Sequence, residues 1–211
     1  MDATTLIARN DYRLFKQGRL AVIDTQKSNA VTFDGKLADH GTYRNIPEDF
    51  KLGIDAATFF GYSDYRLFRG DQLVVINTEN GNQISYQGAI AGHGTYSNIP
   101  EDFKRGIDAT TLIGRNDYRL FKGDQLVVID TENGNRVTYY GPIADHGTYR
   151  NIPADFRRGI DAATFFGYSD YRLFRGDQLV VIDTQNGNSL SYQGAIADHG
   201  TYQNLSSFWT S

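Results

Sequence analysis

Two sets of side chains that can do chemistry recur in this sequence at one fixed interval. Aspartates and histidines each return every 53 positions, at Asp2, Asp55, Asp108 and Asp161 and at His40, His93, His146 and His199. Carboxylates that face one another repel unless a cation, hydrogen bonds or protonation relieves the charge. Hard oxygen ligands of this kind favour calcium, sodium or magnesium over zinc. If the fold gathers the four aspartates around one opening, the sequence predicts a metal site there.

A further set of side chains alternates in type along the chain. Arg9 and Arg115 occupy the place that Tyr62 and Tyr168 occupy in the intervening copies, each inside a short turn sequence. Tyrosine and arginine are favoured anchors at binding surfaces, and a sugar-like ligand could stack on the tyrosine ring. We therefore predict that these four residues bind a ligand, with a merely variable solvent-facing turn as the alternative. The arginine of each DYRLF stretch is expected instead to pair with an acidic neighbour.

The interval of 53 residues is the length of a repeated unit. Four copies, at about residues 1–53, 54–106, 107–159 and 160–211, account for essentially the whole chain and predict a single domain. The stretch IDAATFFGYSDYRLFRGDQLVVI occurs unchanged at residues 54–76 and 160–182, which indicates duplication of a pair of copies. Each copy has the pattern of four strands separated by turns, and the third run, LVVI, is apolar on both faces. Pro100, followed by two acidic residues, favours a short helix between copies.

Four strands per unit and a period near 50 residues are typical of propeller blades. The sequence thus predicts an all-β fold, a four-bladed β-propeller with a short helix between blades. Asp-Ala-Ala at the start of the unit, YRLFRGDQLVVID after it and a Gly-Pro-Ile-type element near its end resemble the hemopexin repeat. That resemblance implies four blades around a narrow axial channel, with the Asp-Ala-Ala strand innermost and ions held largely by backbone groups.

Two departures from the hemopexin pattern concern the first and last units. Hemopexin-like domains commonly tie these two blades together with a disulfide, and this chain has no cysteine. Closure must therefore come from packing, and we expect Phe208 and Trp209 to fill the place that Phe103 fills elsewhere. The first unit has KQGR where others have KGDQ, so its second hairpin is expected to differ.

The predicted ring limits where a ligand could meet more than one copy. The aspartates begin the innermost strand and can face one another, and the resemblance to the hemopexin repeat favours a structural calcium or sodium ion held by them. The alternative is that each caps local backbone N–H groups and the channel holds only water. The histidines lie in HGTY, after the fourth strand, about 20 Å from the axis and on the order of 28 Å apart. A bis-histidine haem needs imidazoles on both sides of one iron, so haem is not expected, and each ring is predicted to satisfy loop backbone groups.

Charge and composition exclude several classes of partner. The formal net charge of −4 provides no basic surface for nucleic acid or for an anionic membrane. Met1 is followed directly by the repeat, without a basic-then-apolar leader, and no apolar run approaches 18 residues. As written, the sequence predicts a cytoplasmic protein that binds neither nucleic acid nor membranes; secretion by another route stays open.

A near-perfect repeat supplies like groups held apart, whereas catalysis needs unlike groups brought together. The sequence contains no Gly-rich phosphate loop, zinc-protease helix or nucleophile elbow, and we predict that it is not an enzyme. The favoured hypothesis is a lectin-like ligand-binding module that recognises a glycan or another small molecule at the loop face. One alternative is a protein-interaction or structural scaffold, which could dock partner proteins or a second copy of itself as a homodimer. Such a scaffold could also be an engineered or reconstructed symmetric repeat protein. Another is a carrier of haem or a polyamine.

Overall fold

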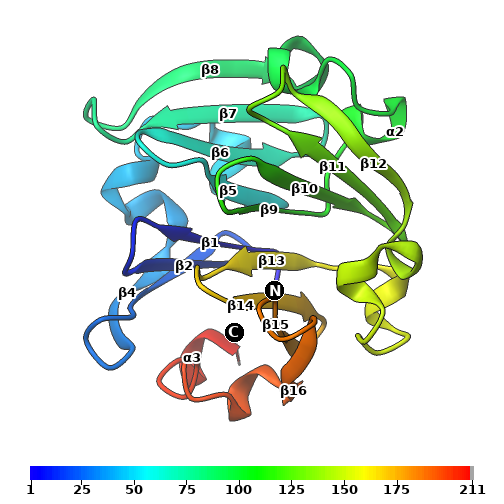
Figure 1. Ribbon diagram of the computed structural model, residues 1–211. Coiled ribbons are helices and arrows are strands. Elements are labelled where there is room, and N and C mark those ends of the chain that lie inside the picture. The colour runs from blue at the N-terminus through cyan, green and yellow to red at the C-terminus, as the bar shows by residue number, and fades with distance from the viewer. Residues whose placement is uncertain (210–211) are drawn as a thin grey trace.

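The computed structural model describes residues 1–209, the side chains of Ser206 and Ser207 excepted, and contains four antiparallel sheets of four strands each. Each sheet is one blade, and its strands follow one another in chain order from the centre of the molecule to its edge. The innermost strands are β1 (Ala3–Ile7), β5 (Ala56–Phe59), β9 (Ala109–Ile113) and β13 (Ala162–Phe165). Each of these four contacts the next, and β13 contacts β1, so the ring is closed (Figure 1). The predicted all-β, four-bladed propeller is confirmed.

The other strands of each blade run outward by simple hairpins. The second strands are β2 (Asp11–Lys16), β6 (Asp64–Arg69), β10 (Asp117–Lys122) and β14 (Asp170–Arg175). The third strands are β3 (Arg19–Asp24), β7 (Gln72–Asn77), β11 (Gln125–Asp130) and β15 (Gln178–Asp183). The outermost strands are β4 (Ala30–Lys36), β8 (Gln83–Ala89), β12 (Arg136–Pro142) and β16 (Ser189–Ala195). The first hairpin turn between second and third strands, at Gln17 and Gly18, keeps the two-residue length of the others but has both residues at positive φ.

Short helices connect the blades. A 3₁₀ turn follows each outermost strand, at η1 (Leu37–Asp39), η3 (Ile90–Gly92), η5 (Ile143–Asp145) and η8 (Ile196–Asp198). A second 3₁₀ turn follows in three blades, at η2 (Gly41–Tyr43), η4 (Gly94–Tyr96) and η6 (Gly147–Tyr149). The last connecting elements are α1 (Glu48–Lys51), α2 (Glu101–Lys104), η7 (Phe156–Arg158) and α3 (Ser206–Trp209). As predicted, α2 begins after Pro100 with two acidic residues in its first turn, where the helix dipole favours negative charge. Within the described residues, no helix has the length and apolarity needed to cross a membrane.

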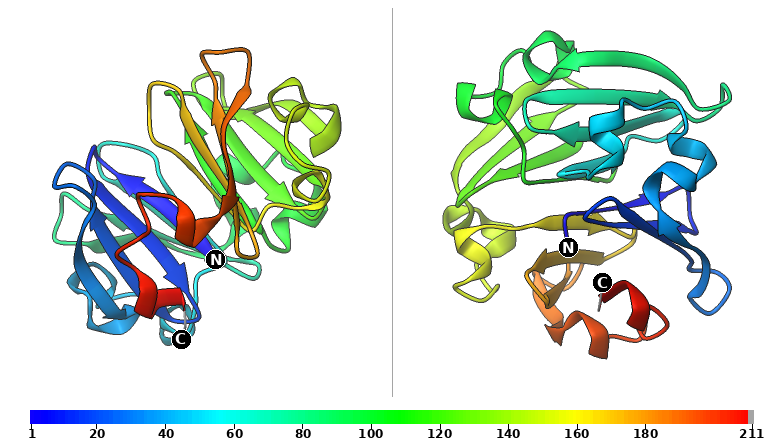
Figure 2. Two further views of the ribbon diagram at one scale, coloured as in Figure 1. Left: turned by 90° about the horizontal axis from the view of Figure 1, so that it is seen from below. Right: turned by 180° about the vertical axis from the view of Figure 1, so that it is seen from behind.

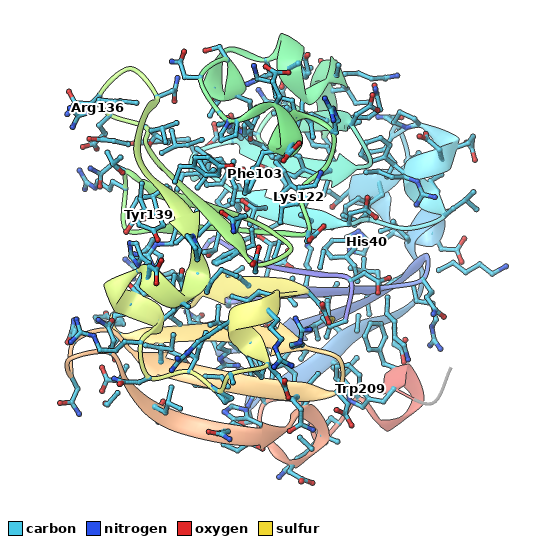
Figure 3. All side chains as sticks on the ribbon, turned by 90° about the vertical axis from the view of Figure 1, so that its right-hand side faces the viewer. His40, Phe103, Lys122, Arg136, Tyr139 and Trp209 are labelled. Atoms are coloured by element: carbon cyan, nitrogen blue, oxygen red, sulfur yellow. The ribbon has the colours of Figure 1, made fainter. Side chains whose placement is uncertain are left out.

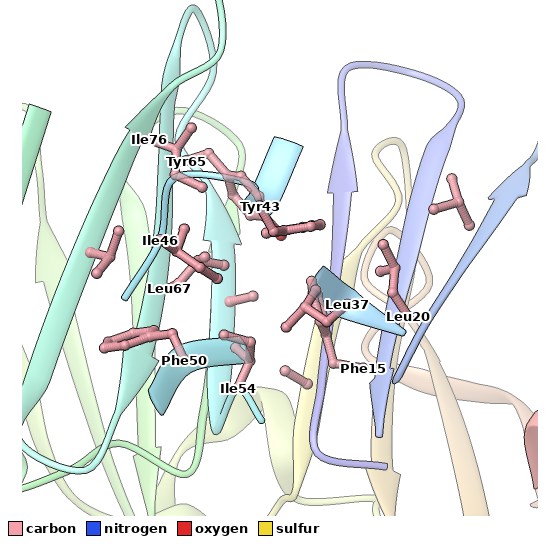
Figure 4. Close-up of a cluster of buried hydrophobic side chains, with 14 residues drawn as sticks. Phe15, Leu20, Leu37, Tyr43, Ile46, Phe50, Ile54, Tyr65, Leu67 and Ile76 are labelled. Carbon is pink, nitrogen blue, oxygen red and sulfur yellow. The ribbon is translucent and has the colours of Figure 1, made fainter. Parts of the chain in front are cut away.

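The hydrophobic core is divided among the four junctions between blades. The third strand is buried on both faces, because its alternate residues face the two neighbouring blades: in β7, Val74 and Ile76 face the first blade, whereas Leu73 and Val75 face the third. Figure 4 shows the first junction, where residues of β2 and β3 pack in one cluster with residues of β6 and β7 and with the buried Phe50 of α1. One blade alone would expose both of these apolar faces to water, so the ring is the smallest unit that buries them.

Candidate functional site

The four repeated aspartates lie just before the innermost strands, as predicted, but each acts within its own blade. The carboxylates of Asp2, Asp55, Asp108 and Asp161 accept the backbone N–H at the turn between the second and third strands, at distances between 2.5 and 2.7 Å. Asp55 and Asp108 are exposed and the other two are half-buried. Within residues 1–209, no three His, Cys, Asp or Glu side chains are placed to hold a metal ion together. The carboxylates therefore stabilise the turns between the second and third strands, and their role as ion ligands stays a prediction.

The centre of the ring is a narrow channel lined by threonines instead. Its volume is about 30 Å³, and the threonines that line it are Thr4, Thr5, Thr58, Thr110, Thr111 and Thr164. A space of that size holds a water molecule or a small ion. The channel thus offers neutral threonine hydroxyl oxygens, which suit a hard cation better than a soft one.

The threonine hydroxyls also join every blade to the next. Thr58 and Thr110 share a hydrogen bond of 3.0 Å, and the equivalent pair Thr4 and Thr164 joins the last blade to the first. At the two remaining junctions the backbone N–H of Phe59 or Phe165 donates to Thr5 or Thr111, at 3.1 Å each. This twofold pattern explains why odd units read ATT and even units read AAT.

The histidines stabilise the loop in which they lie. The Nδ1 atom of each histidine accepts the backbone N–H of the threonine two residues later, at 3.3 Å, and so caps the short turn of the HGTY sequence. Each ring also packs edge-on against an aromatic residue of the outermost strand, with centroids 4.7–5.0 Å apart. In Figure 3, His40 lies on a different blade from Tyr139, the ring partner of His146. The predicted role in satisfying loop backbone is confirmed.

The surroundings of the histidines disfavour their charged form. Partial burial of His40 lowers its pKa, and the nearby Arg13 guanidinium lowers it further against a weaker opposing effect of Asp11. The same causes lower the pKa of His93, His146 and His199. Neutral imidazole is also the form that can accept a hydrogen bond at Nδ1.

A buried arginine and two tyrosines form a polar chain across each blade junction. Arg13 donates two hydrogen bonds to the Asp11 carboxylate, at 2.9 and 2.7 Å, and a third to the hydroxyl of Tyr43, at 2.9 Å. The Tyr43 hydroxyl lies 2.8 Å from that of Tyr65 in the next blade. Burial alone would lower the pKa of Arg13, but the tyrosine oxygens and Asp11 outweigh it and hold the pKa above its ordinary value. The predicted structural pairing of these arginines with acidic neighbours is confirmed.

The arginine–tyrosine chain recurs at all four junctions. The tyrosine hydroxyl pairs are Tyr43–Tyr65, Tyr96–Tyr118, Tyr149–Tyr171 and Tyr202–Tyr12, at 2.8–3.0 Å. Sequence reasoning missed these pairs, although a tyrosine invariant in every HGTY and every DYRLF stretch was a signal of them.

The alternating turns carry the most exposed aromatic side chains described. Tyr62 and Tyr168 are 94 % and 93 % exposed, and both have positive φ, at 51° and 53°. An L-residue other than glycine costs roughly 1 kcal/mol in this conformation, and such positions cluster at ligand sites. Arg9 and Arg115, at the equivalent positions of the odd blades, are also exposed. All four turns follow innermost strands and therefore lie at the same end of the ring.

The turns that carry Tyr62 and Tyr168, in the second and fourth blades, are supported by an aromatic ring and an arginine beneath them. The ring of Phe60 lies 3.7 Å from the Arg66 guanidinium, which is itself bound by the Asp64 carboxylate through two hydrogen bonds. The backbone N–H of Phe60 donates to the Asp64 carbonyl at 2.8 Å. Tyr62 is thus presented to solvent by a turn whose shape is fixed before any ligand arrives.

Comparison with known proteins relates this geometry to other chains. No protein-family model matches the sequence, and no curated protein matches it either. Among solved structures, the hemopexin fold protein CP4 from cow pea superimposes with a TM-score of 0.80 at 19% identity, covering 97% of both chains. The chain has the hemopexin fold. A plant lectin with two metal binding sites from Cicer arietinum shares the hemopexin fold with a TM-score of 0.78 at 21% identity, again over 97% of each chain. The seed albumin LS24 from Lathyrus sativus gives 0.76 at 19% identity over 96% of each chain.

In this hemopexin fold the ring is closed without a disulfide. The amino group of Lys16 donates to the carbonyl of Trp209 at 2.9 Å and to that of Phe208 at 3.4 Å. Phe208 is fully buried in the junction between the last and first blades, and Trp209 packs against the same cluster. Figures 2 and 3 show α3, which carries Trp209, against the first blade. The predicted closure by packing of Phe208 and Trp209 is confirmed.

Proposed function

We propose that this protein is a non-enzymatic recognition module that binds glycans at the face formed by Tyr62, Tyr168, Arg9 and Arg115. The observation that carries the proposal is the near-complete exposure of two tyrosine rings on strained turns. Phe60 and Arg66 pack behind the turn of Tyr62, and Phe166 and Arg172 pack behind the turn of Tyr168. A turn whose backbone is already ordered does not lose further backbone entropy when a ligand stacks on its tyrosine.

The chemistry of these turns suits a sugar. A tyrosine face stacks on the apolar side of a pyranose ring, and the phenol hydroxyl bonds to sugar hydroxyls. The two tyrosines lie on opposite blades, and the arginines lie between them, so the face has twofold symmetry. Two equivalent weak sites bind a branched or clustered glycan by avidity. A structural neighbour from Cicer arietinum is named a lectin, and another, a plant albumin from the same species, is described as showing hemagglutination; these descriptions apply to those proteins and support the proposal by analogy.

A glycan array with the wild-type protein and a Tyr62→Ala/Tyr168→Ala variant tests this proposal. We expect the wild type to bind a subset of glycans and the double variant to lose that binding by at least tenfold. Tyr140→Ala is the matched control, because Tyr140 is also exposed, at 54 %, but lies on an outermost strand. Absence of binding to every glycan would remove the lectin function, and binding that persists in the double variant would remove the site.

We further propose that the channel holds a structural calcium or sodium ion. The threonine and backbone oxygens of the innermost strands fit a hard cation, and the channel has room for one. An ion present at about 100 times its dissociation constant stabilises the fold by about 2.7 kcal/mol and raises Tm by roughly 5 to 10 °C for a chain of this size. Melting with calcium, with sodium and with choline as the only cation tests this; identical melting temperatures in all three would refute it.

A further inference from the structure

A cavity of about 480 Å³ lies at the junction between the third and fourth blades. Its walls include Asp155 and Phe156 from the connector, Asp161 before β13, Arg175 at the end of β14, and Gln193 of β16. Asp161 precedes the innermost strand, whereas Tyr168 follows it, so the cavity opens at the end of the ring away from the tyrosine turns. Its volume falls within the range of small-molecule sites, about 300–1,000 Å³.

The side chains that line the cavity differ from those at the preceding junction. At the preceding junction Tyr140 stands at the position of Gln193, and its ring packs 6.3 Å from that of Phe103. Lys122 stands there at the position of Arg175 and donates to the Asp102 carbonyl at 2.7 Å (Figure 3). Gln193 is shorter than this tyrosine and leaves more space beside the connector. The first junction also has a glutamine, Gln87, at this position, so the junction between blades three and four differs from the first in its connector.

The connector changes at the same junction. Glu48 and Glu101 begin the α-helices α1 and α2 and bind the lysine three residues later, at 2.7 Å each. The third connector has Ala154 at this position, and it forms the 3₁₀ turn η7 in place of an α-helix. Loss of the glutamate removes both a helix-favouring acidic residue at the N-terminus and the ion pair.

The polar groups of the cavity are fixed in place by hydrogen bonds to backbone. The Arg175 guanidinium donates to the Gly159 carbonyl at 2.6 Å, and the Asp161 carboxylate accepts the Gly176 N–H at 2.6 Å. Buried Phe156, together with Pro153 and Leu179, supplies apolar wall. Groups that are already oriented bind a ligand without the entropy cost of ordering them.

The lining combines hydrogen-bond acceptors with donors. The two carboxylates accept, the guanidinium donates, and the glutamine amides do both. A hydroxyl group is itself both donor and acceptor, so a neutral ligand with several hydroxyls can use all of these groups. An ion of either sign would meet a like charge in the wall.

We propose that this cavity is a second binding site, for a mono- or disaccharide. It is separate from the tyrosine face and does not depend on that face for its chemistry. It also gives a function to the connector that has Ala154 where the other internal connectors have a glutamate.

The test is a titration of ¹⁵N-labelled protein with glucose, galactose, mannose, N-acetylglucosamine and maltose at millimolar concentrations, followed by the amide signals of Gly176 and Gln178. We expect at least one sugar to give saturable shifts of both signals. Gln193→Tyr, which copies the side chain of the preceding junction, is expected to weaken this binding by at least tenfold. Ala154→Glu, which restores the glutamate of the other internal connectors, is expected to weaken sugar binding as well. It replaces Gln193→Tyr as the test variant if Gln193→Tyr has a lower melting temperature than the wild type.

Two control variants separate this site from the tyrosine face. Gln87→Tyr makes the same substitution at the first junction and should leave the shifts of Gly176 and Gln178 unchanged. Tyr62→Ala/Tyr168→Ala should also leave them unchanged, even where it abolishes glycan binding on the array. Absence of saturable shifts with every sugar, or shifts that survive in both Gln193→Tyr and Ala154→Glu, would overturn the proposal without affecting the tyrosine face.

Discussion

Acidification should destabilise this propeller through its four histidines, well before the carboxylates are protonated. The folded structure lowers the pKa of all four rings below the ordinary value of 6.5, by burial and by a neighbouring arginine. Above that value both the folded and the unfolded chain carry neutral histidines, so the free energy of unfolding does not change. As the pH falls below it, the unfolded chain takes up protons first, and the folded state loses stability.

The size of the effect follows from the number of histidines. Where the unfolded chain is protonated and the folded chain is not, each histidine removes about 1.4 kcal/mol per pH unit, so four together remove about 5 kcal/mol per pH unit. The rings are only half-buried, and screening by water shortens the pH interval over which this slope holds. Domains commonly have 5–15 kcal/mol of stability in total, so even a part of this maximal slope changes the free energy of unfolding by a measurable amount.

Urea unfolding between pH 8 and pH 5, followed by circular dichroism, measures this dependence. The matched variants replace histidine by asparagine, whose side-chain oxygen can still cap the HGTY turn but does not titrate. Each His→Asn replacement, beginning with His40, should reduce the slope below pH 6.5 by about a quarter. A free energy of unfolding that is constant from pH 7 to pH 5, or a slope that is unchanged in the fourfold variant, would refute the reasoning.

Three further predictions concern the junctions and the hairpins. Tyr43→Phe leaves the Arg13 guanidinium without one buried partner and should lower the free energy of unfolding by about 1–3 kcal/mol in urea titrations; an unchanged midpoint would contradict it. Thr110→Ala gives an odd blade the alanine of an even one and removes the hydrogen bond to Thr58, so it should lower the free energy of unfolding by about 1 kcal/mol in the same measurement. An unchanged free energy of unfolding would show that this hydrogen bond does not stabilise the fold. Asp108→Asn should leave stabilisation by calcium intact if the channel oxygens hold the ion, whereas its loss in thermal melts would assign the ion to the aspartates.

The repeat alone predicted the ring, because local patterns carry that information. Three features can be recognised without any knowledge of distant contacts: the third strand sequence, which is apolar on both faces, the turn sequences and the period of 53 residues. The capping role of the histidines was accessible for the same reason, since donor and acceptor are two residues apart.

What the sequence did not reveal depends on neighbours in other blades. The Thr4–Thr164 contact spans 160 residues and Tyr12–Tyr202 spans 190, and each forms only after the ring has closed. The cavity at Gln193 was equally invisible, because it depends on how this side chain meets a connector about 40 residues earlier in the chain. The aspartates were placed correctly at the ends of the innermost strands, but their hairpin bonds compete with the expected gathering around an ion.

Each blade is made from one continuous stretch of chain, and no strand is exchanged between the first and last sheets. The joint that Tyr12 and Tyr202 make is therefore of the same kind as the three internal joints. The place where the polypeptide starts is then a matter of gene order and not of architecture. A circularly permuted gene that begins at any of the connectors encodes the same set of interfaces, and two separate half-chains of two blades each carry complementary surfaces for reassembly.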